Sequence, residues 1–380
     1  MGRLKIGILI PKSDMYPTLG MDLLNGLKLA FSKSESIQES PSFIVENIGV
    51  AADDQVLKSA EKLILQEDVD LTLSFCGVLL LPQLARLQEQ YKRPLIHLDL
   101  GGRVYNEEHC NPYVLHHTLN LWQSSFAAGQ YAAEHMGKKC LLAVSFYDGA
   151  YHMTEAFNLG FTSKGGNITR FFVGNADYKL ETFEGLFQGI QEEEPDFIYG
   201  IFSYKEGDKF LKAFANSDYN GKIPIMANPS LTDEAIATED YGIQKLETIA
   251  SWSFDDGSPA MREFISNYTA QYDIPVNIIS LMGYEVGITI VESISSEGTI
   301  MARLQDALNG KSIESPRGLL RYNSFNESQL DEFKIRKFEF NEVQYHNNIT
   351  GTIDSSFTEK LQEELKDLPA NGWQNPYLCT

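Results

Sequence analysis

The stretch LKIGILIPKSDMYPTLGMDLLNGLKLAF, residues 4–31, decides the fold class of this chain. Residues 4–10 form a short apolar run rich in β-branched side chains, which predicts a buried strand. Pro11 ends the run, and a polar loop that contains Tyr16 follows. Leucines then recur at helical spacing through residues 19–30. The loop therefore lies at the carboxyl end of a strand, which is where open α/β sheets bind ligands.

The same strand–loop–helix unit recurs along most of the chain. Further strands are predicted at residues 43–50, 69–75, 94–98, 139–146, 168–173, 196–202, 223–227 and 246–254. Helices are predicted between them at residues 55–66, 82–91, 121–136, 154–163, 180–192 and 209–215, with a loop at 203–207. Two runs of this alternation predict two doubly wound, Rossmann-like α/β lobes with largely parallel sheets.

The pattern changes after residue 254. Helices are predicted at residues 259–272, 278–294, 301–308 and 358–368, and strands at 319–322, 333–340 and 343–346. The tail, residues 373–380, carries aromatic side chains that we expect to pack on one lobe.

Composition limits the possible classes of function. The chain has 380 residues, enough for two domains of ordinary size, and a formal net charge of −21. An acidic surface repels phosphate backbones, so we expect no nucleic-acid partner. The sequence holds no apolar run of about 18 residues, so we expect no membrane-spanning helix.

The sequence lacks the familiar motifs of metal, cofactor and catalytic sites. Its four cysteines form no C-x-x-C pair, which argues against a structural zinc ion. His116 and His117 are adjacent, so in a strand their rings face opposite sides and are poorly placed to share a metal. No GxGxxG, P-loop, GxSxG or HExxH motif occurs. We therefore expect no metal, no cofactor and no catalytic residue.

Several segments together resemble one known family. They are LKIGILIPKS with LGMDLLNGLKLAF, VDLTLSFCGVLLLPQLARLQEQYKRPLIHLDLGG, KKCLLAVSFYDGAYHMTEAFNLGF, PDFIYGIFSYKEGDKFLKAF, LMGYEVGITIVESI and SPRGLLRYNSFNESQ. Their order and spacing, over about residues 3–345, resemble the type I periplasmic binding proteins, in the leucine/isoleucine/valine-binding branch that serves ABC transporters. The resemblance implies a solute-binding protein whose partners are a small polar ligand and a membrane permease or sensor.

The resemblance also implies how the chain is divided. The first lobe would take residues 1–119 and 254–329, and the second would take 120–253 and 330–380. Three crossovers would form the hinge, and the ligand would bind between the lobes. Met1 and Gly2 stand directly before the first strand, which leaves no room for a signal peptide. Either the protein is cytosolic, or its leader has been replaced at the start of this sequence. The resemblance favours a periplasmic or cell-surface-anchored protein.

Four residues of the expected ligand wall carry a role in the resemblance. Glu206 follows a strand where the family has an acidic partner for the ligand's α-amino group, although a solvated helix-cap glutamate is the alternative. Tyr151 stands where a tyrosine covers the ligand, or is a half-buried aromatic. Tyr16 would be an aromatic lid, or an exposed loop residue. Tyr284 is either a ligand contact or a packed core tyrosine.

Two further loops depart from the family pattern. The loop Phe75-Cys76-Gly77-Val78 has no serine or threonine to hold an α-carboxylate, although backbone N–H groups at the start of the next helix can hold an anion. The loop Asp99-Leu100-Gly101-Gly102 places a carboxylate at the cleft, where Asp99 needs a cationic ligand or a neighbour such as Arg103. These departures extend the possible ligands from branched-chain amino acids to modified amino acids, peptides and amides.

The remaining residues of the expected wall also follow strands. They are Tyr147, Ser203, Tyr204 and Asn228. Two alternatives to a transport protein stay open from the residues. One is the ligand-sensing ectodomain of a larger receptor. The other is an enzyme on the same fold, in which Tyr147, Asp148, Tyr151 and His152 would supply acid and base groups.

Overall fold

The computed structural model describes residues 3–34, 39–235, 237, 239–294, 300 and 303–369. Its first sheet has five strands, all parallel, in the order β2-β1-β3-β4-β5. They are β1 (Lys5–Ile10), β2 (Ser42–Asn47), β3 (Leu71–Ser74), β4 (Leu95–Asp99) and β5 (Val114–Thr118). Strands β3, β4 and β5 are buried throughout, as expected for a parallel sheet covered on both faces.

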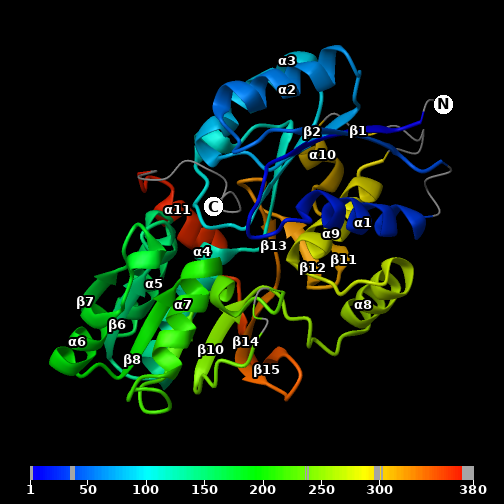
Figure 1. Ribbon diagram of the computed structural model, residues 1–380. Coiled ribbons are helices and arrows are strands. Elements are labelled where there is room, and N and C mark those ends of the chain that lie inside the picture. The colour runs from blue at the N-terminus through cyan, green and yellow to red at the C-terminus, as the bar shows by residue number, and fades with distance from the viewer. Residues whose placement is uncertain are drawn as a thin grey trace.

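Helices from two distant parts of the chain cover this sheet (Figure 1). α2 (Asp53–Leu65) and α3 (Leu81–Tyr91) pack on one face. α1 (Leu19–Ser32) packs on the other face, together with α8 (Pro259–Tyr272), α9 (Ile278–Glu292) and the short α10 (Leu304–Leu308). In α1, Leu23 and Leu27 are fully buried and Leu19 is nearly so, whereas Leu24 is only partly buried. The C-terminal half of the chain thus returns to complete the first lobe.

The second sheet has seven strands in the order β15-β14-β10-β9-β8-β6-β7. The parallel ones are β6 (Lys139–Val144), β7 (Asn167–Val173), β8 (Phe197–Ile201), β9 (Ile225–Ala227) and β10 (Leu246–Ala250). β14 (Glu332–Phe340) and β15 (Tyr345–Asp354) add an antiparallel edge. The helices of this lobe are α4 (Leu121–His135), α5 (Met153–Ser163), α6 (Glu184–Glu193), α7 (Tyr204–Ala215) and α11 (Thr358–Leu365). The predicted fold class, two doubly wound α/β lobes, is confirmed.

Each lobe contains one pair of helices that cross at glycines. A Cβ on Gly26 of α1 would lie 2.2 Å from the Ser280 carbonyl oxygen of α9. In the second lobe, a Cβ on Gly160 of α5 would lie 2.1 Å from the Phe126 carbonyl oxygen of α4. Side chains cannot fit at such distances, so the two glycines permit the close helix contacts on which each lobe is built.

The chain passes between the two sheets after β5, after β10 and before β14. Hydrogen bonds tie these three segments together. The Thr118 N–H donates to the Ser328 hydroxyl at 2.9 Å, and the Asn120 amide donates to the Ser328 carbonyl at 2.8 Å. The Ser251 hydroxyl donates to the Leu119 carbonyl at 2.7 Å. A small sheet of β11 (Ile313–Ser315), β12 (Gly318–Tyr322) and β13 (Ser328–Gln329) lies beside them.

Several predicted element boundaries were wrong. α7 begins at Tyr204, so most of the predicted loop at 203–207 is the first turn of a helix. α6 begins at Glu184 rather than at residue 180, and β10 ends at Ala250 rather than at 254. β15 runs far beyond the predicted segment 343–346. The tail at 373–380, and residues 301 and 302 of a predicted helix, fall outside the described residues.

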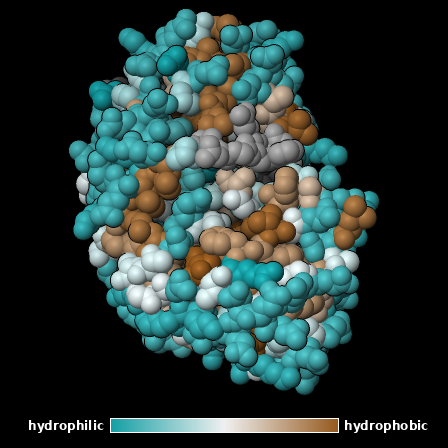
Figure 2. All heavy atoms as spheres, turned by 90° about the vertical axis from the view of Figure 1, so that its left-hand side faces the viewer, coloured by the Kyte–Doolittle hydropathy of each residue, from teal (hydrophilic) through white to brown (hydrophobic). Residues whose placement is uncertain are grey.

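Two surface features complete the fold. Within the described ranges, no helix combines the length and the apolar character needed to cross a membrane. β7 is an edge strand on the side that Figure 2 turns toward the viewer, and it leaves Phe171 and Val173 more than half exposed. Hydrophobic residues gather in the middle of that face, whereas its lower end is mostly hydrophilic (Figure 2).

Candidate functional site

A groove of about 410 Å³ lies where the two lobes meet. The loop after β1, including Tyr16, forms most of it, and Tyr204 at the start of α7 closes it from the second lobe. Its volume falls in the range of small-molecule sites. Tyr204 has a φ of +46°, which is rare for a bulky residue and fixes the direction in which its ring leaves the helix.

Tyr16 bridges the lobes instead of lying exposed in its loop. Its side chain is buried, and its hydroxyl donates to the carboxylate of Asp233, which follows β9. Burial raises the pKa of Asp233. Arg336 of β14 lies behind this carboxylate, bonded to the Trp252 carbonyl at 3.0 Å and to the Thr232 hydroxyl at 3.3 Å. The alternative of an ordinary exposed loop tyrosine is therefore wrong.

The loop after β3 lies at the carboxyl end of that strand and contains no serine or threonine. Phe75, Cys76, Gly77 and Val78 are all buried, and burial raises the pKa of the Cys76 thiol to about 12. Among the described residues, the N–H groups from Cys76 to Leu79 have no hydrogen-bond acceptor. These N–H groups are unused donors at a strand exit, and such donors attract a negative group.

In the loop after β4, a backbone N–H of the same loop binds the Asp99 carboxylate. Asp99 is buried, and its Oδ1 accepts the N–H of Gly101 at 2.6 Å. Gly101 has a φ of +84° and lies against the Asn120 backbone, so this tight turn requires glycine. Leu100 joins the hydrophobic core. The Gly102 carbonyl accepts the His152 N–H at 2.9 Å, which fixes this loop against the second lobe.

Aromatic side chains line the second lobe beside these contacts. Tyr151 is buried, and a Cβ on Gly102 would lie 3.1 Å from its ring. The Arg103 guanidinium lies 5.1 Å from the ring centroid of Tyr151, which is a cation–π contact across the two lobes. Tyr147 is half-buried and packs edge-on against Phe146. The predicted tyrosines of this loop are thus brought to the lobe boundary.

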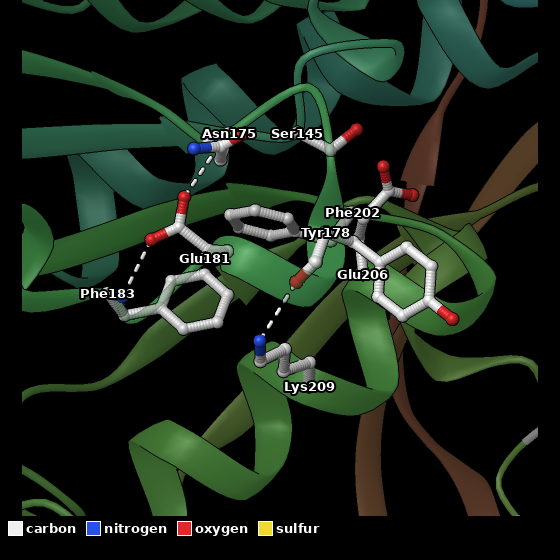
Figure 3. Close-up of a pocket in the computed structure, with 9 residues that line it drawn as sticks. Ser145, Asn175, Tyr178, Glu181, Phe183, Phe202, Glu206 and Lys209 are labelled. Carbon is white, nitrogen blue, oxygen red and sulfur yellow. Dashed lines mark hydrogen bonds between the residues drawn. The ribbon is translucent and has the colours of Figure 1, made fainter.

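Glu206 is half-buried and lines a pocket of the second lobe together with Tyr178 and Phe202 (Figure 3). Burial and the nearby Asp148 carboxylate raise the pKa of Glu206 to about 7. Lys209, one turn further along α7, donates to the Tyr178 carbonyl at 2.9 Å, and in Figure 3 the Glu206 carboxylate points away from it. Within the described part of the chain, no basic side chain lies within ion-pair distance of Glu206.

Ser203 supports this pair of acidic residues from the end of β8. It is buried, and its hydroxyl donates to Asp148 Oδ1 at 3.0 Å. Asp148 in turn lies against Ser145, whose hydroxyl accepts the Asp148 N–H at 3.0 Å. Two carboxyl groups, those of Asp148 and Glu206, are therefore held near each other, and a cation between them would lower the free energy of both.

Two predicted residues have structural contacts. Asn228 is fully buried, where its Oδ1 accepts the Ser230 N–H at 3.1 Å and its amide contacts the Met153 sulfur at 3.0 Å. Tyr284 packs against Phe264 of α8, with ring centroids 5.0 Å apart. The structure does not bring Tyr284 to the strand-exit loops, and its packing favours the core-tyrosine alternative.

His152, the base of the enzyme alternative, has backbone contacts on both ring nitrogens. His152 Nδ1 accepts the Val104 N–H at 3.0 Å, and Nε2 lies 3.3 Å from the Pro369 carbonyl oxygen. Burial lowers the pKa of His152 to about 4. In the described ranges, no three His, Cys, Asp or Glu side chains are grouped to hold a metal ion.

Comparison with known proteins identifies the family. A family model described as "Periplasmic binding protein" matches residues 3–326. The chain belongs to the periplasmic binding protein family. It is 21% identical over 329 residues to the "Leu/Ile/Val-binding protein homolog 6" of Brucella suis, covering 83% of this chain and 82% of that protein.

Solved structures share the fold of this binding protein. A solute-binding protein of an ABC transporter from Rhodopseudomonas palustris, in complex with 3,4-dihydroxybenzoic acid, superposes with a TM-score of 0.75 at 22% identity. The alignment covers 93% of this chain and 98% of that one. An ABC transporter substrate-binding protein from Sphaerobacter thermophilus gives 0.81 at 19% identity, over 93% and 98% of the two chains.

Sequence reasoning missed two groups at the lobe boundary of this binding protein. Asp233 and Arg336 lie 103 positions apart in the chain, so no local pattern connects them. Arg336 alternates with apolar residues in a strand, and that pattern alone predicts an outward, solvated side chain. The one available signal was the pair Asp233-Glu234 directly after a strand-exit loop.

Proposed function

We propose that this protein is a non-enzymatic solute-binding protein that closes two lobes around a zwitterionic ligand, an amino acid or an amino-acid-like compound. It would deliver the ligand to an ABC-type permease, or report it to a membrane sensor, from the periplasm or the cell surface. The lobes would divide as residues 1–119 with 254–329 and residues 120–253 with 330–380. This division follows the strands that each sheet contains.

Two strand-exit segments of opposite polarity, one in each lobe, support the proposal, and we expect them to face each other across the ligand cleft. The first lobe offers the backbone N–H groups from Cys76 to Leu79. The second lobe offers Glu206 and Asp148, with a pKa of about 7 for Glu206. A carboxylate would bind the first wall and an ammonium the second. The ammonium would lower the pKa of Glu206 and pair with the ionised form.

The remaining wall residues would shape and cover the ligand. Tyr16 and Tyr151 close the boundary between the lobes by direct contacts, and Tyr204 borders the groove. Exclusion of water by these rings would strengthen every polar contact inside the cleft. The relative named as a Leu/Ile/Val-binding protein homolog supports an amino-acid ligand.

An aromatic carboxylic acid is the second candidate ligand. The Rhodopseudomonas palustris protein of the same fold holds 3,4-dihydroxybenzoic acid. Such a ligand suits the donor wall and the tyrosines. It would supply no ammonium group for Glu206, which favours the zwitterion.

The test compares Glu206→Gln with Glu184→Gln. Both glutamates stand in the first turn of a helix of the second lobe, but Glu184 is exposed and outside the cleft wall. A thermal-shift screen of amino acids, short peptides, amides and benzoates first identifies a ligand, since saturation at about 100 times Kd adds roughly 2.7 kcal/mol of stability. Calorimetry then gives Kd for each variant.

We expect Glu206→Gln to weaken binding of an amine-bearing ligand by more than about tenfold, because a hydrogen bond to a charged group contributes about 1.5–3 kcal/mol. Glu184→Gln should bind as the wild type does. Equal affinities for Glu206→Gln and the wild type would remove Glu206 from the site. Binding confined to benzoates would move the proposal to the second candidate.

A further inference from the structure

A buried cluster of imidazoles and one phenol lies beneath the donor wall. His97 is on β4, His116 is on β5, and Tyr105 and His109 are in the connection between these strands. All four side chains are buried, three of them completely. The Tyr105 and His116 rings are stacked with centroids 4.1 Å apart. The proposed ligand chemistry uses none of these groups, so their arrangement needs its own explanation.

The hydrogen bonds of the cluster assign its protons. His97 Nε2 lies 3.0 Å from the Cys76 carbonyl oxygen, and His116 Nε2 lies 3.1 Å from the His109 carbonyl oxygen. A carbonyl oxygen only accepts, so both Nε2 atoms carry the proton. His97 Nδ1 is then an acceptor, and the Tyr105 hydroxyl lies 3.4 Å from it. The Tyr105 hydroxyl therefore contacts the side of the His97 ring opposite to the nitrogen that binds the Cys76 carbonyl. His116 Nδ1 also lies 3.4 Å from His97 Nδ1, and with this assignment that contact carries no proton.

The cluster is neutral at physiological pH. Burial lowers the pKa of His97, and burial with the neighbouring His97 lowers that of His116. Burial also lowers the pKa of His109 to about 4, although a backbone hydrogen bond to Val78 acts in the opposite direction. The donors therefore stay in one tautomer across the pH range in which the protein would work.

The peptide unit transmits this orientation to the cleft. The carbonyl of Cys76 and the N–H of Gly77 belong to one planar trans peptide, so they point in opposite directions. His97 draws the carbonyl toward the interior of the lobe. The Gly77 N–H must then point away from the cluster.

We propose that His97 is a positioning residue for ligand binding, which holds the Cys76 carbonyl so that the N–H groups of the following residues face the cleft as donors. This rests on the proposed function, because it makes the loop after β3 the wall that binds a carboxylate. The loop has no serine or threonine hydroxyl to fix its conformation. The His97 imidazole would fix it instead, through the Cys76 carbonyl on the inner side of the loop. Ligand contact remains with the backbone, and His97 acts through it.

The first test needs no ligand. His97→Gln keeps an N–H donor at the reach of Nε2, whereas His97→Leu removes the donor and His97→Asn places its amide one bond short. His135→Leu is the control, because His135 is exposed on α4. Hydrogen–deuterium exchange of residues 77–84 should be at least about tenfold faster in the Leu and Asn variants, since the loop loses its anchor. The Gln and control variants should exchange within about twofold of the wild type.

The second test uses L-leucine and L-leucinamide, which lacks the carboxylate. In His97→Leu and His97→Asn, affinity for L-leucine should fall by about tenfold, while affinity for L-leucinamide changes by less than about twofold. His97→Gln should restore the difference. Wild-type protein that binds neither probe would overturn the amino-acid ligand while the exchange experiment still decides the role of His97. Wild-type exchange in both His97→Leu and His97→Asn would overturn the positioning role itself.

Discussion

Two glutamates near the hinge are both fully buried, but their pKa values are shifted in opposite directions. At pH 7 Glu285 is ionised and Glu327 is protonated. Glu285 of α9 accepts from Arg317 at 2.6 Å and from His117 at 3.0 Å. Burial acts to raise its pKa, but the Arg317 charge outweighs burial and lowers the pKa to about 2. Glu327 accepts the Thr118 hydroxyl at 3.0 Å, and burial raises its pKa to about 8, although its neutral hydrogen-bond partners act to lower the pKa. The partner, not the depth of burial, decides whether such a carboxyl group is ionised.

The difference gives the two residues different uses. Arg317 also donates to the Ser251 hydroxyl at 2.9 Å, and Ser251 donates to the Leu119 carbonyl. The Glu285–Arg317 pair therefore fixes two of the three segments that join the lobes. Glu327 joins the first and third segments by accepting the Thr118 hydroxyl, and a retained proton on its carboxyl group avoids an unpaired buried charge there.

Breaking the ion pair should have the largest effect. Arg317→Met leaves the Glu285 carboxylate buried beside a neutral imidazole, and loss of one member of a buried pair costs about 3–5 kcal/mol. Urea unfolding at pH 7 measures this loss. The double variant Glu285→Gln with Arg317→Met should recover part of it. A loss below about 1 kcal/mol in the single variant would mean that the pair does not hold the hinge.

Replacing Glu327 by glutamine should change the free energy of unfolding by less than Arg317→Met does, and in the opposite direction. A carboxyl group whose pKa is raised by folding keeps its proton when the unfolded chain has lost it. Wild-type stability should therefore fall as pH rises from about 4.5 to about 8, by up to roughly 1.4 kcal/mol per pH unit. Glu327→Gln mimics the protonated form, so it should lack this decline and be more stable at pH 8 by about 2–4 kcal/mol.

The measurement is the free energy of unfolding at several pH values between 4.5 and 8.5. Glu332→Gln is a suitable control, because Glu332 is partly exposed at the start of β14. Parallel pH profiles for Glu327→Gln and the wild type would show that Glu327 is already ionised in the folded protein. That result would remove the contrast with Glu285.

The sequence was sufficient for the fold class because its evidence is local. The apolar run at residues 4–10 and the leucines of α1 predict a strand and a helix without reference to distant residues. Element boundaries failed where neighbours in space decide them. α7 starts at Tyr204, and the Ser203 hydroxyl before it makes no cap but donates to Asp148, which lies 55 positions earlier in the chain.

The candidate site was predictable only in part. The strand-exit loops follow from the alternation, and Glu206 and Tyr151 follow from the family resemblance. The partner of Tyr16 is Asp233, 217 positions away, and the partner of Glu285 is Arg317 in a different element. His97 sits within an apolar strand, where the sequence does not show which carbonyl it binds. Long-range pairs of this kind require the three-dimensional structure.

The central claim is that the cleft binds both charged groups of a zwitterionic ligand, the carboxylate and the ammonium. Calorimetric titration of the wild-type protein with L-leucine, L-leucinamide and 4-methylpentanoate tests it most directly, because each analogue lacks one charged group. We expect L-leucine to bind at least about tenfold more tightly than either analogue, since each wall would lose a charge-assisted hydrogen bond. Equal or tighter binding of 4-methylpentanoate would contradict the account, because Glu206 would then have no ammonium group to bind.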